Sequence, residues 1–451
     1  MREGNLKAPT RHHIDWNNPD FYDEGQALAE MERVFDICHG CRRCVSLCQS
    51  FPKLFDLVGA TADGEVHGIQ KEAYWSVVDQ CDLCDLCDLC CMTKCPSTPP
   101  HPWQLDFPQL MLRAQAMKHK NGHVAAREKF LASTDVHGQF AGIPIVVDVV
   151  NAVNKTKAMR KQMDARLGVH PDAWRPGLAG QRFRWGRAMN YTAHPVVGGQ
   201  RTPGKVAIFS TCYVNNNEPG IGADLVKLLD HNRIPYEIVE KEHCCGMPKL
   251  ELGDLEGVEK LWRANMPVMA RYAREGWAIV TAVPSCTLMF KQEPPLMFPE
   301  DADTQRVKQA MFDPFEYFIA RHNDGLLRTD FKAALGSVNY HIPCHGRVQN
   351  IGKRTEEMFK LIGQTFEVKL NTVERCSGHA GTYGVKTPTH PVAMNIGKPV
   401  FKSMAKDGPD RISSDCPMAG HHIAQGMEQL ATPAKALQHP ISLVRIAYGL
   451  E

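Results

Sequence analysis

The sequence lacks any excess of charge of one sign and any long hydrophobic run. Its 451 residues contain 52 basic and 50 acidic side chains. Proteins that bind nucleic acid concentrate positive charge on phosphate contacts, so we expect no nucleic-acid partner. The most apolar window, residues 141–153, contains Pro144 and Asp148 and is shorter than the roughly 18 apolar residues of a membrane span. We therefore expect no transmembrane segment.

Several catalytic signatures are also missing. The chain has no phosphate-binding P-loop and no serine or cysteine hydrolase motif with a recognisable base. The glycines Gly220 and Gly222 follow an expected strand but lack the third glycine and the acidic partner of a dinucleotide fingerprint. We therefore expect any flavin or nicotinamide site to lie on another subunit.

Cysteine is the residue that the sequence has in excess. There are 17 cysteines, clumped at short spacings, and no apolar signal segment follows Met1. Clumped thiols favour metal ligation over disulfides in a reducing compartment. We expect a cytoplasmic protein, and the sequence leaves open a peripheral attachment to the cytoplasmic face of a membrane.

The first cysteine run has the C-x2-C-x2-C-x3-C spacing of one half of a two-cluster bacterial ferredoxin. It consists of Cys38, Cys41, Cys44 and Cys48. Apolar residues at helical spacing predict a helix over 24–35 that leads into this run. We expect Gly40 to adopt a positive φ that turns backbone amides toward cluster sulfurs.

The second run has six thiols between residues 81 and 95, where three Asp-Leu-Cys tripeptides make the ligand register ambiguous. The frame with regular spacing uses Cys81, Cys84, Cys87 and Cys91. The other frame uses Cys84, Cys87, Cys90 and Cys95. We prefer the second frame because Pro96 follows its last cysteine and prevents the chain from continuing as a helix.

The two runs together predict two 4Fe-4S clusters, because the fourth cysteine of each run crosses to the other cluster in such ferredoxins. The expected ligands of the first cluster are Cys38, Cys41, Cys44 and Cys95. The expected ligands of the second are Cys84, Cys87, Cys90 and Cys48, with Cys81 and Cys91 as alternatives.

The second half of the chain repeats itself. In the first copy, each expected strand is followed by cysteine. The strand at 206–209 precedes Cys212, the strand at 236–239 precedes the pair Cys244 and Cys245, and the strand at 278–283 precedes Cys286. In the second copy, strands expected at 338–342, 366–370 and 411–414 precede Cys344, Cys376 and Cys416. Helices between the strands predict parallel sheets, and the loops after parallel strands meet at one edge. The cysteines of each copy should therefore converge.

These patterns predict an α+β protein overall. We expect a helical, ferredoxin-like two-cluster module, then linker helices over 109–130 and 146–167, then a pseudo-twofold α/β domain with parallel sheets built from two cysteine-rich repeats. The expected divisions are an N-terminal arm at 1–23, the two-cluster domain at 24–108, the helical linker at 109–203, repeat 1 at 204–300 and repeat 2 with a C-terminal helix at 301–451.

The order of these motifs resembles a known family. Two ferredoxin-type runs followed by two Cys...Cys-Cys-Gly...Cys modules are similar to the heterodisulfide reductase-related iron-sulfur subunits of anaerobic glycerol-3-phosphate dehydrogenase and glycolate oxidase, from about Phe35 to the C-terminus. The resemblance implies an electron-transfer component that works with a flavoprotein dehydrogenase or another redox protein and with quinone or another carrier. In that family each repeat ends in C-x2-C, whereas here Met289 and Ala419 replace the last cysteine and Ser377 replaces a member of the pair.

The two repeats therefore retain different numbers of thiols. Four thiols suffice for a 4Fe-4S cluster, so repeat 1 is a candidate for a third cluster. Its ligands would be Cys212, Cys244, Cys245 and Cys286. Repeat 2 is a weaker candidate, because Cys344, Cys376 and Cys416 would need a histidine to join them. The histidines nearest to these cysteines in sequence are His341, His345 and His379.

Two other functions fit the same residues. Cys244 and Cys245 are candidate catalytic thiols of a disulfide or thiol reductase. The C-x2-C runs also suit tetrahedral zinc, as in a metal-bound scaffold or redox sensor.

Overall fold

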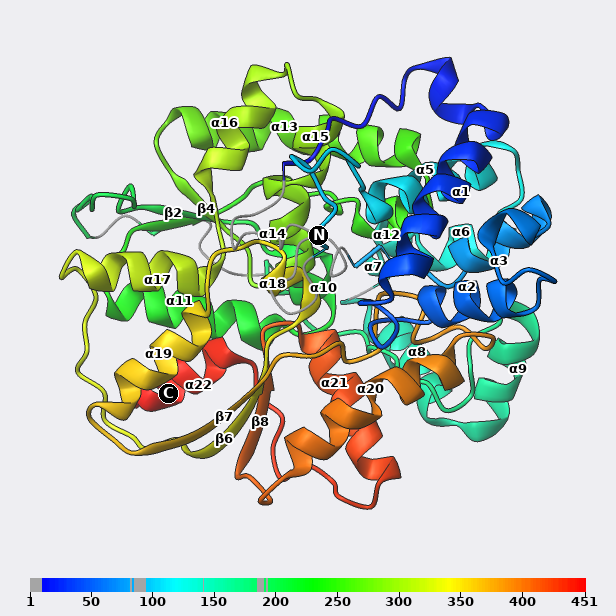
Figure 1. Ribbon diagram of the computed structural model, residues 1–451. Helices are drawn as coiled ribbons and strands as arrows, with labels where there is room; N and C mark the ends of the chain where they lie inside the picture. The colour runs from blue at the N-terminus through cyan, green and yellow to red at the C-terminus, as the bar shows by residue number, and fades with distance from the viewer. Residues whose placement is uncertain (1–9, 82, 85–94, 141, 185–189, 192–193) are drawn as a thin grey trace.

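Helices and two mostly parallel sheets build the protein (Figure 1). The computed structural model describes residues 10–81, 83–84, 95–140, 142–184, 190–191 and 194–451. No helix within these ranges has the length and apolar character needed to cross a membrane.

The N-terminal part is helical. Its elements are η1 (Pro19–Tyr22), α1 (Glu24–Cys41), α2 (Ser50–Gly59), η2 (Val66–Gly68), η3 (Lys71–Ala73), α3 (Tyr74–Val78) and α5 (Phe107–Lys120). Asp23 begins α1, because its side chain accepts a hydrogen bond from the backbone N–H of Gln26. The helix extends beyond the expected 24–35 and includes both Cys38 and Cys41.

Each of the two expected linker helices is divided in two. Gly122, with a φ of 76°, lies between α5 and α6 (Ala126–Leu131). Thr156, with a ψ of 115°, separates α8 (Pro144–Lys155) from α9 (Lys157–Leu167). The short helix α7 (Thr134–Gly138) lies between these pairs. The prediction of two continuous helices was wrong, because single residues with non-helical backbone angles interrupt both apolar patterns.

The two sheets have the same central topology. The first has the order β1-β3-β2-β4-β5 and the second β7-β6-β8. In both sheets the first strand of the repeat lies between the second and the third, and these neighbours are parallel. The strands are β1 (Asn190–Tyr191), β2 (Val206–Ile208), β3 (Tyr236–Ile238), β4 (Ala278–Val280), β5 (Met311–Phe312), β6 (Gly336–His341), β7 (Val368–Val373) and β8 (Arg411–Ser414). The prediction of parallel sheets in both repeats is confirmed.

Helices connect the strands and pack the two repeats together. Repeat 1 contains α10 (Thr211–Asn216), α11 (Pro219–His231), α12 (Met247–Leu250), α13 (Leu255–Arg274), α14 (Pro284–Lys291) and α15 (Glu293–Met297). The helices α16 (Ala302–Ala310) and α17 (Pro314–Asn323) follow residue 300 and flank β5 of the first sheet. Repeat 2 contains α18 (Cys344–Arg347), α19 (Arg354–Gly363), α20 (His390–Ala405), α21 (Pro417–Gln429) and α22 (Pro440–Ala447). Helix α11 contacts α22, α17 contacts α19, and α14 contacts α18. Figure 1 shows α11, α17, α19 and α22 between the two sheets.

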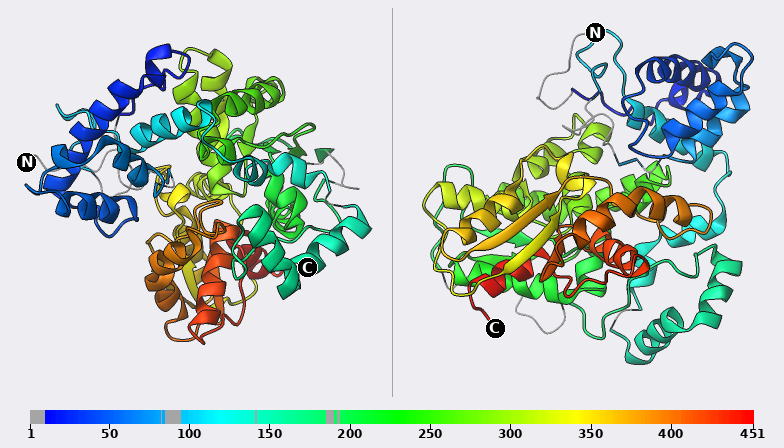
Figure 2. Two further views of the ribbon diagram at one scale, coloured as in Figure 1. Left: turned by 90° about the vertical axis from the view of Figure 1, so that its right-hand side faces the viewer. Right: turned by 60° about the horizontal axis from the view of Figure 1, so that its bottom comes forward.

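One hydrophobic core joins the N-terminal helices to both repeats. It includes Met31 of α1, Met111 of α5, Phe209 after β2 and Val338 of β6, all of which are fully buried. Every residue of β2 and β4 is buried, as expected for parallel strands covered on both faces. The N-terminal helices therefore pack against the repeats, beside them rather than between the sheets (Figure 2).

Candidate metal centres

A cysteine follows each of the six strands β2, β3, β4, β6, β7 and β8. In repeat 1, Cys212 lies in α10 after β2, Cys244 and Cys245 follow β3, and Cys286 lies in α14 after β4. In repeat 2, Cys344 begins α18 after β6, Cys376 follows β7, and Cys416 precedes α21 after β8. Because the carboxyl ends of parallel strands share one edge of a sheet, each repeat brings its cysteines to a single edge.

The four thiols of repeat 1 form a connected group. Cys244 shares hydrogen bonds with Cys212 and Cys245, and Cys245 shares one with Cys286. Cys244, Cys245 and Cys286 are no more than 4% exposed. The sequence prediction that these cysteines converge is therefore confirmed, although their role as ligands stays a prediction.

Cys244 is the thiol of this group that most readily ionises. The hydrogen bonds from Cys212 and Cys245 lower the pKa of Cys244 well below its usual value, despite burial. Thr134 Oγ1 donates to Cys244 Sγ at 3.2 Å, and the backbone N–H of Gly246 donates at 3.5 Å. The same hydrogen bonds, together with burial, raise the pKa values of Cys212 and Cys245. The group is therefore built to place negative charge on Cys244 Sγ.

Two side chains hold the loop before Cys244. Asn265 of α13, 1% exposed, accepts a hydrogen bond from the backbone N–H of His243 at 2.9 Å and donates to Cys244 O at 3.2 Å. Asp135 of α7 accepts from the backbone N–H of Cys244 at 3.0 Å. Burial, followed by the charge of Cys244, raises the pKa of Asp135. Sequence reasoning missed Thr134 and Asp135, because nothing local links residues more than a hundred positions apart.

Backbone strain lies directly beside the first cysteine. Thr211 has a φ of 66° and is 1% exposed. A β-branched residue in this left-handed region is rare and costs about 1–3 kcal/mol, which the surrounding structure must offset. The carboxylate of Glu242 accepts hydrogen bonds from the backbone N–H and the hydroxyl of Ser210, both at 2.7 Å, and so holds the turn that presents Cys212.

Met289 occupies the position of the missing fifth thiol of repeat 1. Its side chain is fully buried, and its Cε would lie 3.3 Å from a Cβ added to Gly246. A thioether therefore packs beside the glycine of the Cys-Cys-Gly motif, so this position supplies apolar contact in place of a thiolate.

The thiols Cys344 and Cys416 of repeat 2 ionise less readily than Cys244. Burial raises the pKa of Cys344 well above its usual value and that of Cys416 to about 11. Cys344 interacts electrostatically with Cys376 and Cys416, so the three loops do converge. Cys416 also interacts electrostatically with Cys286 of repeat 1, so cysteines of the two repeats lie near each other.

The histidines near these cysteines differ in whether their ring nitrogens already have hydrogen-bond partners. His341 uses both ring nitrogens, on Ser414 Oγ at 3.0 Å and on Arg375 O at 2.9 Å. His379 is 7% exposed, and its Nε2 has no hydrogen-bond partner in the described part of the chain. The ring centroid of His422 lies 5.7 Å from that of His379, and its Nε2 is likewise buried without a partner there. Burial lowers the pKa values of His345 and His379 to about 4, so both rings are neutral near pH 7.

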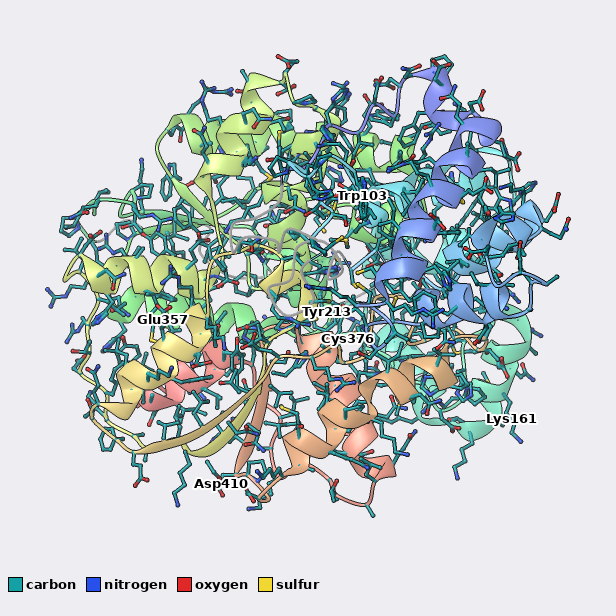
Figure 3. All side chains as sticks on the ribbon, in the orientation of Figure 1. Trp103, Lys161, Tyr213, Glu357, Cys376 and Asp410 are labelled. Carbon is teal, nitrogen blue, oxygen red and sulfur yellow. The ribbon has the colours of Figure 1, made fainter. Side chains whose placement is uncertain are left out.

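A polar network bridges the two repeats beside these cysteines. Tyr213, which follows Cys212, donates its hydroxyl to Glu218 Oε1 at 2.7 Å, and His421 of α21 contacts the same oxygen at 2.6 Å. The ring of Trp174 stacks on His421 with centroids 4.4 Å apart. Both Tyr213 and Cys376 lie near the middle of the molecule in the view of Figure 3.

The N-terminal cysteines lie at the end of α1 and around the exit of α3. Cys38 and Cys41 belong to the last turn of α1, whereas Cys44 and Cys48 follow it. The expected positive φ falls on Arg42, at 53°, and the expectation for Gly40 was wrong because Gly40 is still helical. Six of these cysteines are partly buried and pack against the hydrophobic core: Cys38, Cys44, Cys48, Cys81, Cys84 and Cys95.

The choice between the two ligand frames stays a prediction. Cys87, Cys90 and Cys91 lie outside the described residues, and both frames need Cys87. Within the described ranges, no group of three or more His, Cys, Asp or Glu side chains is arranged to hold a single metal ion. A four-iron cluster asks for a different donor set, namely thiolates in apolar surroundings with N–H or O–H donors to sulfur. The chemistry of Cys212, Cys244, Cys245 and Cys286 fits that set.

The described residues at the start of the second cysteine run lie beside repeat 1. Leu83 lines a small cavity together with Met247 and Leu250 of α12, the helix that follows the Cys-Cys-Gly motif. Gln115 of α5 donates to Cys81 O at 3.0 Å. Tyr383, in the loop after Cys376, donates to Gln80 Oε1 at 3.2 Å. The start of the second cysteine run therefore lies beside the helix that follows the Cys-Cys-Gly motif.

Comparison with known proteins identifies both repeats. The family model described as "Cysteine-rich domain" matches residues 206–291 and 338–424. The chain is 26% identical over 347 residues to a subunit of the anaerobic glycerol-3-phosphate dehydrogenase of Escherichia coli (strain K12), covering 76% of this chain and 82% of that protein.

Two further relatives cover less of this chain. A subunit of the CoM/CoB fumarate reductase of Methanothermobacter marburgensis is 25% identical over 253 residues, which are 56% of this chain and 48% of that protein. Lactate utilization protein A 2 of Bacillus mycoides is 28% identical over 215 residues, which are 47% of this chain and 87% of that protein. The chain therefore carries two copies of the cysteine-rich domain and is a homologue of subunits of anaerobic glycerol-3-phosphate dehydrogenase and CoM/CoB fumarate reductase.

Proposed function

We propose that the protein is an iron-sulfur electron-transfer subunit of an oxidoreductase. Two 4Fe-4S clusters are held by the ferredoxin-type cysteines, and a third cluster is held by the four thiols of repeat 1. The observation that carries this proposal is that described cysteines of both groups belong to or pack against one continuous core, where Leu83 lines a small cavity together with the helix after the Cys-Cys-Gly motif. Clusters in such neighbouring positions exchange single electrons.

The residues around Cys244 would tune the third cluster. When bound, such a cluster supplies a one-electron redox couple whose potential depends on burial and on hydrogen bonds to sulfur. Thr134 and the backbone of Gly246 provide two such donors to Cys244, and Asn265 fixes the loop that carries Cys244. This chain's own residues thus set the electrostatic environment, while electrons enter and leave through partners.

The names of the relatives suggest the kind of partner. A glycerol-3-phosphate dehydrogenase and a fumarate reductase, to which two of these relatives belong, oxidise or reduce a substrate by two electrons. We propose a flavoprotein dehydrogenase as the electron donor and a quinone or another small carrier as the acceptor. The repeats then form the side at which one of these partners docks.

Reduction and reoxidation of the purified protein test this function. Dithionite should bleach its visible absorption, and a soluble naphthoquinone should then restore it. The double variant Cys244→Ala/Cys245→Ala should slow reoxidation by at least about tenfold, since it removes the terminal cluster. The control His243→Ala alters an exposed neighbouring side chain and should reoxidise like the wild type. The proposal is contradicted if the wild type has no visible absorption. It is also contradicted if Cys244→Ala/Cys245→Ala is reoxidised at the same rate as His243→Ala.

A second function is favoured by the low pKa of Cys244. A thiolate held by two neighbouring thiols is a suitable nucleophile for a disulfide. Reduction of one disulfide consumes two electrons and two protons and yields two thiols. If this is the activity, protein reduced by dithionite and then freed of reductant should convert cystamine to cysteamine, and Cys244→Ala should abolish the conversion.

A further inference from the structure

A cavity of about 470 Å³ lies beside the junction of the two repeats. Its wall is formed by α14 of repeat 1, by β5 of the first sheet and by the segment that follows α18 of repeat 2. Helix α14 carries Cys286, α18 begins at Cys344, and the two helices pack against each other. The volume falls in the range of sites for small organic molecules, which is about 300–1,000 Å³.

The inner wall of this cavity is apolar. Leu288, Met311, Phe312 and Val348 line it, and none of the four is more than 7% exposed. Their side chains come from both repeats, so a molecule seated against them touches both. An apolar wall of this kind favours a ligand with a hydrocarbon or aromatic body.

The rim of the cavity is cationic. Four basic side chains line the cavity, namely Arg11, Arg201, Lys291 and Lys308, whereas Glu316 is the one acidic side chain among the described lining residues. Lys291 already pairs with Glu316, and Arg11 pairs with Asp106 at 2.9 Å.

The positive charge of Arg201 and Lys308 is therefore not offset at the cavity. Neither residue makes an ion pair in the part of the chain that the structure describes, and both side chains are exposed at the rim. Two cations above an apolar wall suit an acidic group attached to an apolar body.

One buried acceptor adds specificity. Gln349 lines the cavity, and its amide nitrogen donates to His345 O at 3.0 Å and Pro284 O at 3.4 Å, which fixes the amide group. Its Oε1 is buried and has no hydrogen-bond partner in the described ranges. A ligand that brings an O–H or N–H group to this oxygen would satisfy it, and an unsatisfied buried oxygen is costly.

We propose that this cavity binds an organic anion with an apolar body. The acidic head, a carboxylate, sulfonate or phosphate, lies between Arg201 and Lys308, the body rests on the wall formed by Leu288, Phe312 and Val348, and a hydroxyl or amine donates to Gln349 Oε1. The proposal does not depend on the clusters, because none of its contacts is made by a cysteine. Since the cavity wall is formed by α14 and the segment after α18, occupancy would also stabilise the contact between the two repeats.

Calorimetric titration with a matched pair of probes tests the proposal. The anionic probe is 8-anilino-1-naphthalenesulfonate, which has an aromatic body, an N–H group and one sulfonate. The neutral probe is N-phenyl-1-naphthylamine, which has the same body without the acid. The full-length protein should bind the sulfonate at one site, and the neutral probe should bind at least about tenfold more weakly, because it lacks the interaction with the two cations.

Variants assign the binding to the cavity. Arg201→Gln/Lys308→Gln should weaken sulfonate binding by about tenfold and leave binding of the neutral probe unchanged within about twofold. The control Lys260→Gln/Lys402→Gln removes two exposed cations elsewhere and should have no effect. Ile145→Ser removes the most exposed large apolar side chain, at 78%, and should also have no effect, which excludes adhesion of the probe to the linker.

Three results would overturn the proposal. They are the absence of a saturable sulfonate site, equal affinity for the two probes, and unchanged sulfonate affinity in Arg201→Gln/Lys308→Gln. Circular dichroism and iron content should match the wild type in every variant, so a loss of binding reports on the cavity rather than on folding.

Discussion

Replacing Gly378 with alanine should destabilise repeat 2 far more than the same change at an unconstrained glycine. Gly378 follows Cys376 and Ser377 and has a φ of 82°. A Cβ at this position would lie 2.0 Å from Ala393 O and 2.9 Å from Ala393 C, and both atoms belong to the backbone of α20. Ala393 is fully buried, so the helix has no free space into which it can move.

The expected magnitude has two parts. Alanine in the left-handed region costs about 1 kcal/mol. Overlap with a buried backbone costs about 1–3 kcal/mol more, as overpacking of a core does. The free energy of unfolding should therefore fall by about 2–4 kcal/mol in Gly378→Ala. Gly408, with a φ of 55° and no atom within 4 Å of an added Cβ, isolates the first part, so Gly408→Ala should cost about 1 kcal/mol.

Urea unfolding followed by tryptophan fluorescence measures the difference. With a slope of about 2–3 kcal/mol per molar urea, the midpoint should shift by about 1 M in Gly378→Ala and by about 0.3–0.5 M in Gly408→Ala. Gly246→Ala should resemble the control more closely, because its nearest contact is the flexible end of Met289 at 3.3 Å. Equal shifts in Gly378→Ala and Gly408→Ala would refute the steric reasoning.

Three other predictions concern the surroundings of the cysteines. Asn265→Ala leaves the backbone groups before Cys244 without their buried partners and should lower the free energy of unfolding by about 2–3 kcal/mol in the same urea assay, whereas a loss below about 0.5 kcal/mol would contradict this role. Burial is the largest single influence on the pKa of Glu218 and raises it, but the hydrogen bonds from His421 and Tyr213 and the nearby histidine charges together lower the pKa below its usual value of 4.5. Glu218 therefore stabilises the folded state above about pH 4.5 and loses this effect as the pH falls through its lowered folded-state pKa. The stability of Glu218→Gln should accordingly lie below that of the wild type at pH 6 and approach it at pH 3, and a difference that is independent of pH would argue against the pairing. Thr134→Val removes a donor to Cys244 Sγ and should lower the midpoint potential of the third cluster in a spectroscopic redox titration, while an unchanged potential would exclude Thr134 from tuning it.

Much of the repeat architecture could be predicted from local sequence. Apolar runs of three to six residues alternate with helical patterns, so parallel strands and the placement of Cys212 and Cys416 after strand ends followed from periodicity alone. The strand β8 has the expected bounds, 411–414. The linker was predicted less well, because Gly122 and Thr156 end helices whose apolar spacing continues across them.

The candidate site was only partly visible in the sequence. Cysteine identity and spacing reveal the thiols, but the groups that act on them come from distant positions. Thr134 reaches Cys244 across 110 residues of sequence, and His422 of α21 meets His379, which lies in the loop before α20. Positive φ was assigned to Gly40 on residue type, whereas the end of α1 places it on Arg42, whose backbone N–H bonds to Cys38 O at 2.9 Å.

Iron and acid-labile sulfide per chain, determined after anaerobic purification, test the central claim most directly. Three four-iron clusters predict about 12 iron and 12 sulfide in the wild type and about 8 of each in Cys244→Ala/Cys245→Ala. The control Cys38→Ala/Cys41→Ala should instead lose a cluster of the N-terminal pair and retain the cluster of repeat 1. A chain that holds zinc or no metal would contradict the electron-transfer function, and a wild-type count of about 8 that does not change in Cys244→Ala/Cys245→Ala would contradict the third cluster.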